Sequence, residues 1–253
     1  MVHFVGAGSG APDLITVRGK RLLMEADVII YAGSLVNPAL LDDRKEGAKV
    51  YNSATMTLEE VIAVMAEAEE AGQTTVRLHT GDPCIYGAIR EQMDALEARG
   101  IEYDTTPGVS SFLAAAAALN IEYTLPDVSQ SVVITRMEGR TPVPGRESIE
   151  SFAAHRASMA IFLSAGQAAE LSGRLLAGGY ERQTPAAIVY KASWPDERVF
   201  VCTVGTLAQT AQENGITKTA LILVGDAIAH STYGRSRLYD PTFSTEYRKA
   251  KER

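Results

Sequence analysis

Hydrophobic and polar positions alternate along the first half of the chain with two different periods. Short runs of β-branched and other apolar residues predict strands at Val2–Val5, Val28–Tyr31, Thr74–Leu78 and Ile101–Tyr103. The longer segments between them predict helices at Val17–Glu25, Leu58–Ala71, Ala88–Arg99 and Ser110–Leu119. Thr57 and Glu60 have the spacing of a capping box, and Gly72 and Gly100 follow helices where a left-handed residue is favoured.

The alternation resumes after Asn120–Asp127, a segment of weak periodicity that contains a proline. Strands are predicted at Ser131–Thr135, Met159–Leu163, Ala186–Tyr190, Arg198–Cys202 and Ala220–Val224. Helices are predicted at Ser148–Ala154, Gln167–Ala177 and Thr206–Asn214. The segment Lys191–Glu197, which we call the hairpin turn, is too short for a crossover helix. Its flanking strands should therefore form an antiparallel hairpin, which makes the second sheet mixed.

This order of elements predicts an α/β protein of two α/β domains. We place the first domain at residues 1–119, a linker at 120–127 and the second domain at 128–230. Residues 231–253 form a polar extension, which we expect to be a frayed, solvated tail.

Composition and charge narrow the class of protein. Of the 253 residues, 46% are apolar, and 24 Lys and Arg oppose 31 Asp and Glu, which gives a net charge of −7. An acidic surface argues against generic nucleic-acid or anionic-membrane binding. The two cysteines exclude a disulfide framework and a Cys-rich zinc site. No signal peptide is visible, and the apolar run Phe112–Leu119 is far short of the ~20 residues that span a bilayer. We therefore expect a cytoplasmic protein.

Ligands of α/β folds lie beyond the carboxyl ends of the strands, so the loops at those ends carry the candidate chemistry. The first loop, Gly6–Asp13, has three glycines at alternate positions and formally satisfies a relaxed dinucleotide fingerprint. Pro12 and Asp13 fall where the fingerprint helix should already run, and no ribose-binding acid follows Val28–Tyr31. A nicotinamide-dependent oxidoreductase and a plain turn without a ligand remain alternatives.

Two further loops connect a strand to a helix. In the second loop, His79–Gly87, Asp82 could accept hydrogen bonds from a ligand or cap its own turn. In the third loop, Thr105–Phe112, either serine is a natural helix N-cap. Trp194 in the hairpin turn could be a stacking surface for a ligand or a plug.

An arginine loop, Arg136–Arg146, carries Arg136, Arg140 and Arg146 among prolines and glycines. Arginine recognises carboxylates through paired hydrogen bonds, although a solvated surface loop would look the same. No catalytic cluster emerges: there is no Gly-x-Ser-x-Gly, Walker or HExxH motif, and the four histidines lack metal-ligand spacing. We assign no catalytic residue and no metal, and this pattern fits chemistry in which the protein mainly orients its reactants.

Taken together, Gly6–Thr16, Thr80–Gly87 and Pro107–Ser111 resemble the S-adenosylmethionine-dependent tetrapyrrole (corrin/porphyrin) methyltransferases, over about residues 1–230. Four segments resemble the branch that methylates carbon C-11 of precorrin-4, or cobalt-precorrin-4, in cobalamin biosynthesis: Tyr31–Pro38, Tyr51–Thr57, Thr135–Pro144 and Ala192–Glu197. Methylation of another precorrin position or of uroporphyrinogen III is the nearest alternative, and a non-enzymatic tetrapyrrole carrier is a more distant one. Ser9 stands where many family members have proline, so the first loop is expected to be looser.

The resemblance implies a homodimer whose cofactor lies in a cleft between the two domains. The positions that match the family's cofactor site are Thr80, Gly81, Asp82, Ile85, Ser110, Ser111, Leu163, Ala192 and Ala220. Gly8 and Ser9 of the first loop would face the anionic tetrapyrrole. Our candidates for docking its carboxylates are Arg136, Arg140 and Arg146, followed by Arg18 and Lys20.

Overall fold

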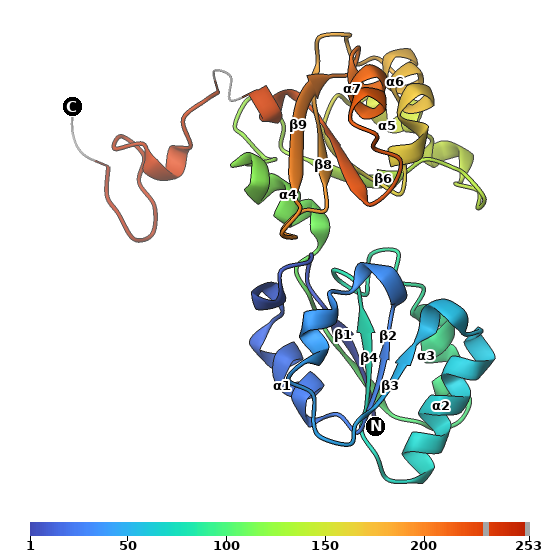
Figure 1. Ribbon diagram of the computed structural model, residues 1–253. Coiled ribbons are helices and arrows are strands. Elements are labelled where there is room, and N and C mark those ends of the chain that lie inside the picture. Colours follow the sequence, from blue (N-terminus) through green and yellow to red (C-terminus); the bar gives the residue numbers. More distant parts are fainter. Residues whose placement is uncertain (230–232, 251–253) are drawn as a thin grey trace. The chain divides into compact units, whose positions relative to one another are not determined.

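The computed structural model describes residues 1–229 and 233–250 (Figure 1). The chain divides into two compact units, which are Met1–Ala115 with Lys191–Glu197, and Ala116–Tyr190 with Arg198–Arg253. The hairpin turn thus belongs to the first unit, although the strands on either side of it belong to the second. The domain boundaries proposed from the sequence stay predictions, and the boundary at His230 lies outside the described residues.

The first unit contains a five-stranded parallel sheet in the order β3-β2-β4-β1-β5. Its strands are β1 (Val2–Gly6), β2 (Val28–Tyr31), β3 (Lys49–Asn52), β4 (Thr75–His79) and β5 (Tyr103–Thr106). Four of them confirm the sequence-based strands to within one or two residues at most ends. The sequence missed β3 because it is an edge strand whose Lys49, Val50 and Asn52 are exposed, which leaves only a weak apolar signal.

Helices cover both faces of this sheet, with α1 on one face and α2 and α3 on the other (Figure 1). The helices of this part of the chain are α1 (Val17–Glu25), α2 (Leu58–Glu70), α3 (Arg90–Glu97) and α4 (Ser111–Leu119). The Thr57–Glu60 capping box is present, and Gly72 and Gly100 have positive φ, as predicted. Leu23 packs with Ile29 and Leu78 on the α1 face, and Met65 packs with Phe4 on the other.

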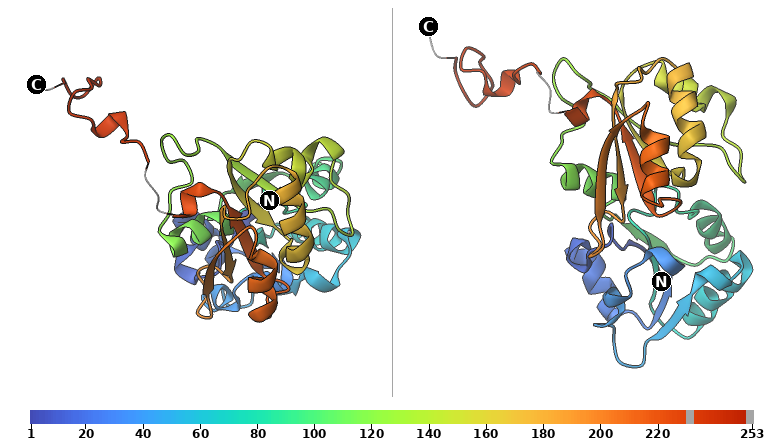
Figure 2. Two further views of the ribbon diagram at one scale, coloured as in Figure 1. Left: turned by 90° about the horizontal axis from the view of Figure 1, so that it is seen from above. Right: turned by 45° about the horizontal axis from the view of Figure 1, so that its top comes forward.

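The second unit contains a mixed sheet in the order β6-β7-β10-β8-β9, which confirms the predicted class. Its strands are β6 (Val132–Arg136), β7 (Ser158–Phe162), β8 (Pro185–Tyr190), β9 (Arg198–Thr203) and β10 (Ala220–Val224). Only the β6–β7 pair is parallel, and β8 and β9 form the expected antiparallel hairpin. Helices α5 (Ile149–Ala153), α6 (Ala168–Ala177) and α7 (Leu207–Glu213) pack side by side and bury one core with the sheet (Figure 2).

The loops contain several short 3-10 helices. They lie at Pro12–Leu14, Gly33–Leu35, Pro38–Leu41, Ser53–Thr55, Gly145–Glu147, Ala165–Gln167, Asp226–Ala229 and Arg237–Tyr239. Within residues 1–229 and 233–250, every helix is too short or too polar to span a bilayer.

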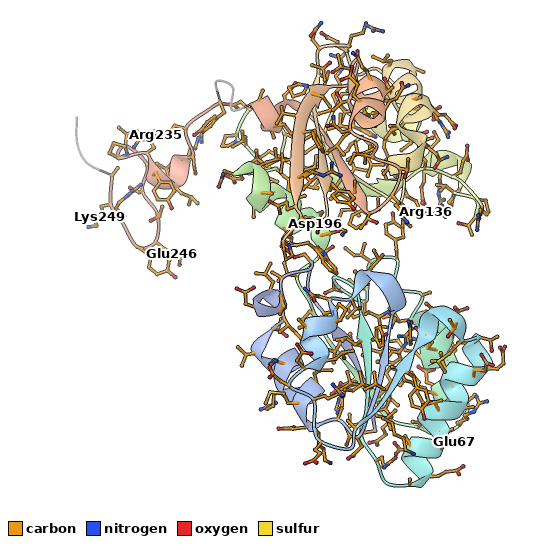
Figure 3. All side chains as sticks on the ribbon, viewed as in Figure 1. Glu67, Arg136, Asp196, Arg235, Glu246 and Lys249 are labelled. Carbon is orange, nitrogen blue, oxygen red and sulfur yellow. The ribbon has the colours of Figure 1, made fainter. Side chains whose placement is uncertain are left out.

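The described part of the C-terminal extension, 233–250, is mostly exposed, as expected for a tail, but it is hydrogen-bonded to itself. The Arg248 guanidinium donates to the carbonyl oxygens of Leu238 and Asp240, at 2.8 Å each. Figure 3 shows Arg235, Glu246 and Lys249 along this segment.

Candidate functional site

The carboxyl end of the first sheet carries the first, second and third loops, whose backbones touch one another. A Cβ atom added to Gly6 would lie 2.6 Å from the Cα atom of Gly108, and one added to Gly108 would lie 2.1 Å from the carbonyl oxygen of Gly81. Gly8 and Gly81 also exchange two backbone hydrogen bonds, with N–O distances of 2.9 and 3.3 Å. Such an approach is open only to glycine. The glycine pattern therefore packs three loops together.

The position at which the first helix begins distinguishes the first loop from a dinucleotide fingerprint. After Gly6 the chain passes through the 3-10 helix Pro12–Leu14 before α1 begins at Val17. Thr16 caps α1 by accepting a hydrogen bond from the Gly19 amide at 3.1 Å. The helix N-terminus that would hold a pyrophosphate is thus not formed by the glycine motif, in agreement with the sequence argument.

Asp82 fastens the second loop to the third. Its Oδ1 atom accepts a hydrogen bond from the Cys84 amide at 2.8 Å, and its Oδ2 atom accepts one from the Gly108 amide at 2.9 Å. Burial opposes ionisation of this carboxyl, but the hydrogen bonds from Cys84 and Gly108 outweigh it and hold the pKa of Asp82 below its ordinary value. Asp82 is therefore a turn cap that also binds a neighbouring loop, and it carries a negative charge at neutral pH.

The six candidate cofactor residues of the second and third loops lie in this packed region. Gly81 faces the third loop, because a Cβ atom added to it would lie 3.5 Å from the Cα atom of Ser110. Ser110 is buried, and Thr80, Asp82 and Ile85 are half-buried. Adjacent peptides and partly covered side chains of this kind suit a ligand that is held largely by backbone groups. The role of these residues stays a prediction.

The hairpin turn brings Ala192, Ser193 and Trp194 to the first loop. The hydroxyl of Ser193 lies 2.8 Å from that of Ser9 and accepts a hydrogen bond from the Ala11 amide at 3.1 Å. The Trp194 indole N–H donates to the Ser9 carbonyl oxygen at 3.2 Å. The expectation that Ser9 loosens the first loop is therefore wrong, because Ser9 is buried and tethered. Trp194 takes the role of a plug.

Leu163 and Ala220, the two remaining cofactor candidates, belong to the second unit. Strands β7 and β10 are antiparallel with Ile161 opposite Ile222, so Leu163 and Ala220 fall at the same end of the sheet. Leu163 has a φ of 54° and is 69% exposed. A large apolar residue held exposed on a left-handed backbone is costly unless something requires it, and such positions cluster at functional sites.

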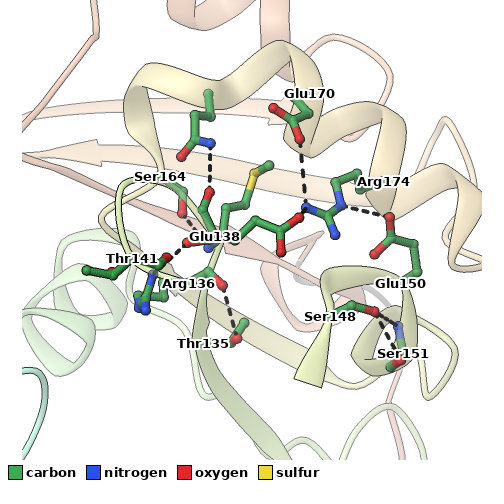
Figure 4. Close-up of polar contacts among 12 residues, drawn as sticks. Thr135, Arg136, Glu138, Thr141, Ser148, Glu150, Ser151, Ser164, Glu170 and Arg174 are labelled. Atoms are coloured by element: carbon green, nitrogen blue, oxygen red, sulfur yellow. Dashed lines mark hydrogen bonds and ion pairs between the residues drawn. The ribbon is translucent and has the colours of Figure 1, made fainter. Parts of the chain in front are cut away.

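The arginine loop is braced by one of its own arginines (Figure 4). The Arg136 guanidinium donates to the carbonyl oxygens of Met137, Thr141 and Pro142 at 2.8–3.2 Å. Arg140 is exposed, and Arg146 is 87% exposed with Glu147 at 3.7 Å. Arg136 thus shapes the loop, whereas Arg140 and Arg146 present their charge to solvent.

Beneath the arginine loop, Arg174 on α6 gathers three acidic groups (Figure 4). It lies 2.8 Å from Glu138, 2.7 Å from Glu150 and 3.7 Å from Glu170. The Arg174 contact is the first cause that holds the pKa of Glu150 below its usual range. This cluster anchors the base of the loop to α6.

The other charged candidates are less distinctive. Arg18 on α1 is exposed, and Lys20 pairs with Asp43. His79 is buried beside Phe4, and burial lowers the pKa of its imidazole to about 3, so it is neutral and structural. Among the described residues, no group of three or more His, Cys, Asp and Glu side chains could hold a metal ion.

A buried arginine behind the second loop was missed by sequence reasoning. On β4, the Nε atom of Arg77 donates to the Gln92 side-chain oxygen at 3.0 Å, and the Gln92 amide donates to the Ala88 carbonyl oxygen at 3.0 Å. Burial lowers the pKa of Arg77 to about 10. Ala88 has a φ of 49° and follows the second loop directly. The two successive hydrogen bonds from Arg77 through Gln92 therefore support the backbone at the end of that loop. The available signal was a charged residue inside an apolar strand.

Comparison with known proteins places this geometry among related folds. The sequence profile of the family described as tetrapyrrole (corrin/porphyrin) methylases matches residues 1–208. A cobalt-precorrin-4 C(11)-methyltransferase of Methanocaldococcus jannaschii is 52% identical over 249 residues, which cover 98% of this chain and 96% of that protein.

Solved structures agree with this similarity. The structure of a cobalt precorrin-4 methyltransferase, a cobalamin biosynthetic enzyme, matches with a TM-score of 0.88 and 45% identity, over 90% of this chain and 95% of that one. A uroporphyrin-III C-methyl transferase of Thermus thermophilus, complexed with S-adenosyl homocysteine, matches with a TM-score of 0.76 and 27% identity, over 90% of this chain and 98% of that one.

Proposed function

Because this chain belongs to the tetrapyrrole (corrin/porphyrin) methylases, we propose that it transfers the methyl group of S-adenosylmethionine to carbon C-11 of precorrin-4 or cobalt-precorrin-4. The observation that carries this proposal is near-full-length similarity to relatives named for that reaction. The segments Tyr31–Pro38 and Tyr51–Thr57 add support, because they resemble the same branch and lie against each other: the Ser53 hydroxyl donates to the Tyr31 carbonyl oxygen.

The second and third loops fit such a cofactor. Asp82 is ionised and half-buried among close-packed backbone groups. Its negative charge would attract the positive charges of a sulfonium compound. We assign Thr80, Gly81, Asp82, Ile85, Ser110, Ser111 and Ala192 of the first unit to it, with Leu163 and Ala220 of the second.

When bound, the cofactor supplies an electrophilic methyl group, which leaves sulfur with the S–C electron pair remaining on S-adenosylhomocysteine. The chain's own task is to orient the two reactants. A nucleophilic carbon of the partly reduced macrocycle must lie in line with the methyl group at ~3–3.5 Å. Such alignment lowers the activation free energy by about 7–11 kcal/mol. The methylated macrocycle then loses a proton from elsewhere in its conjugated system, and no side chain of this protein is assigned to accept it.

Selection of one ring carbon among several similar ones requires the macrocycle to dock in a single orientation. We assign Gly8 and Ser9 of the first loop to the face that meets the macrocycle. Arg140 and Arg146 are exposed and suit its peripheral carboxylates, with Arg136 shaping their loop and Arg18 as a further candidate.

The deciding experiment locates the transferred carbon. The purified protein is incubated with precorrin-4, or in parallel with its cobalt complex, and with cofactor labelled with ¹³C at the methyl group. We expect an NMR signal of a methyl group on C-11, and the faster arm identifies the preferred substrate. A label on another ring carbon would support the alternative family reactions, and absence of transfer in both arms would contradict the proposal.

Calorimetry separates this proposal from an oxidoreductase. We expect S-adenosylhomocysteine to bind and NAD(P) not to bind; binding of NAD(P) alone would favour the dehydrogenase alternative.

Light scattering tests the expected homodimer, which should have about twice the mass of the chain. The cytoplasmic location and the cleft between the domains stay predictions.

A further inference from the structure

The hairpin turn holds the first loop by three separate contacts. Ser193 binds both the Ser9 hydroxyl and the Ala11 amide, at 2.8 and 3.1 Å. Trp194 binds the carbonyl oxygen of Ser9 at 3.2 Å. All four residues that take part belong to the first unit. Two adjacent residues of the turn thus grip the stretch Ser9–Ala11 from one side.

The Trp194 indole lies against Gly10, which has no side chain to obstruct it. A Cβ atom added to Gly10 would lie 2.1 Å from Cδ1 and 2.2 Å from Nε1 of Trp194. From another segment, the Asn37 side-chain amide donates to the Gly10 carbonyl oxygen at 2.8 Å. Gly10 therefore lies between an indole ring and an amide donor, and any side chain at position 10 would displace the ring.

The turn is itself rigid enough to act as a support. Lys191 and Ser193 have φ values of 48° and 68°, which non-glycine residues adopt only where their surroundings enforce it. The Ser193 amide donates to the Glu197 carboxylate at 2.6 Å, and Lys191 lies 2.6 Å from Asp196. These bonds fix the turn independently of the first loop.

We propose that Ser193 and Trp194 are positioning residues that hold Ser9–Ala11 in the conformation that receives the tetrapyrrole. This inference rests on the proposed function and deepens it. The tether supplies by hydrogen bonding the restriction that a proline at position 9 would supply through its ring. Ala192, a candidate cofactor contact, is the neighbour of Ser193, so the turn joins the cofactor region to the substrate loop.

A tether of this kind changes substrate affinity more than chemistry. Without it, only a fraction of the molecules has the receptive loop, so the apparent dissociation constant of the macrocycle rises in proportion. Once the macrocycle is bound the loop is in place, and turnover should change less. A purely structural role would instead lower thermal stability without this split between KM and kcat.

The first test is substitution and rescue. Ser193→Ala removes two hydrogen bonds, and we expect KM for the tetrapyrrole to rise about tenfold, with kcat and S-adenosylhomocysteine affinity changed less than about twofold. Adding Ser9→Pro to that variant should recover most of the loss, because proline restricts the loop without Ser193. Unchanged KM in Ser193→Ala, or no recovery in the double variant, would overturn the proposal.

The second test does not depend on methyl transfer, because Trp194 is the only tryptophan in the chain. Its fluorescence and its single indole N–H resonance report directly on the contact with the first loop. Gly10→Ala should expel the ring, shifting the emission to the red and moving the resonance toward that of a solvated indole. Gly47→Ala is the matched control, since Gly47 has a φ of 78° with nothing within 4 Å of its added Cβ.

The same signal measures macrocycle binding by using uroporphyrin as a stable probe. We expect quenching of Trp194 emission in the wild type, and a right-shifted quenching curve in Ser193→Ala. If quenching occurs but no C-11 methylation is found, the proposed reaction fails while the positioning role stands. If emission and resonance are the same in Gly10→Ala as in the wild type, or Ser193→Ala leaves the quenching curve unmoved, the positioning role fails by itself.

Discussion

The first loop and the arginine loop are both assigned to the substrate, yet different forces hold them in place. The first loop is fixed by backbone contact at Gly6 and Gly8 and by the grip of the hairpin turn. The arginine loop is braced by Arg136, and most of its other residues face solvent. A close-packed loop should be intolerant of added volume, whereas a solvated loop should respond mainly to changes of charge and hydrogen bonding.

The largest expected effect is steric. In Gly108→Ala the new Cβ atom would lie 2.1 Å from the Gly81 carbonyl oxygen, so the loops must separate. We expect a loss of about 3 kcal/mol in the free energy of unfolding, which corresponds to a fall of roughly 6–12 °C in melting temperature, together with loss of S-adenosylhomocysteine binding. Thermal denaturation and calorimetry measure the two effects.

The matched control lies in the arginine loop, at the first residue of the 3-10 helix Gly145–Glu147. A Cβ atom added to Gly145 has nothing within 4 Å, so Gly145→Ala should leave stability within about 0.5 kcal/mol of the wild type. Equal effects of Gly108→Ala and Gly145→Ala would remove the distinction between the close-packed loops of the first sheet and the arginine loop.

A smaller effect is expected where charge holds the packed loops together. Asp82→Asn cannot accept both amide hydrogen bonds with its single remaining oxygen, and we expect a loss of about 2 kcal/mol in the free energy of unfolding near pH 7.

The pH dependence of this loss follows from the lowered pKa of Asp82. A depressed folded-state pKa gives stability that is complete above the unfolded value of 3.8 and is lost as the pH falls through the folded value. Urea denaturation should therefore show a gap between wild type and Asp82→Asn that is constant from pH 7 to about pH 4 and narrows below that pH, as the carboxylate is protonated. A gap that also stays constant below that pH would show that the carboxylate charge is irrelevant.

In the arginine loop, Arg136→Ala should affect substrate binding more than folding. The change leaves three carbonyl oxygens to water, so we expect at most about 1 kcal/mol of destabilisation, while KM for the tetrapyrrole rises about fivefold as the loop loses its shape. Arg136→Lys retains the charge but not the paired donors, and should recover only part of the loss. Steady-state kinetics on both variants decides, and unchanged KM and turnover in Arg136→Ala would refute the role.

The smallest effect is expected at Arg146. Its side chain is 87% exposed, and within residues 1–229 and 233–250 its only ion pair is the 3.7 Å contact with Glu147. Arg146→Ala should therefore leave stability unchanged within about 0.5 kcal/mol. If Arg146 docks a carboxylate, KM should rise about twofold at low salt and the difference should vanish at high salt. A salt-independent difference would point to a change in loop shape instead.

Local sequence signals predicted the elements well where those signals decide the structure. Strand β2 and helix α1 have the predicted bounds, and the Thr57–Glu60 capping box is formed by residues three apart. Strand β3 was missed because Lys49–Asn52 is paired on one side only and buries little. Its existence depends on β2, which the local pattern of four residues does not reveal.

The site was harder to predict because its contacts join distant residues. The turn-capping role of Asp82 could be read from the sequence, but its bond to Gly108 depends on two strands lying on either side of β1. Ser9 was judged from the lack of a proline at position 9, and its tether lies far along the chain at Ser193. Both roles proposed for Trp194 were compatible with the sequence, and only the approach of Gly10 favours the plug.

The position of the hairpin turn bears on how such a protein can evolve. Met1–Ala115 contains the whole first sheet but lacks Lys191–Glu197, which the first unit receives from much later in the chain. A recombination event that joined Met1–Ala115 to the C-terminal half of another protein would place Ser9 and Gly10 against a hairpin turn of different sequence. The two halves are therefore expected to be inherited together, and chimeras should work best when residues 191–197 travel with the N-terminal parent.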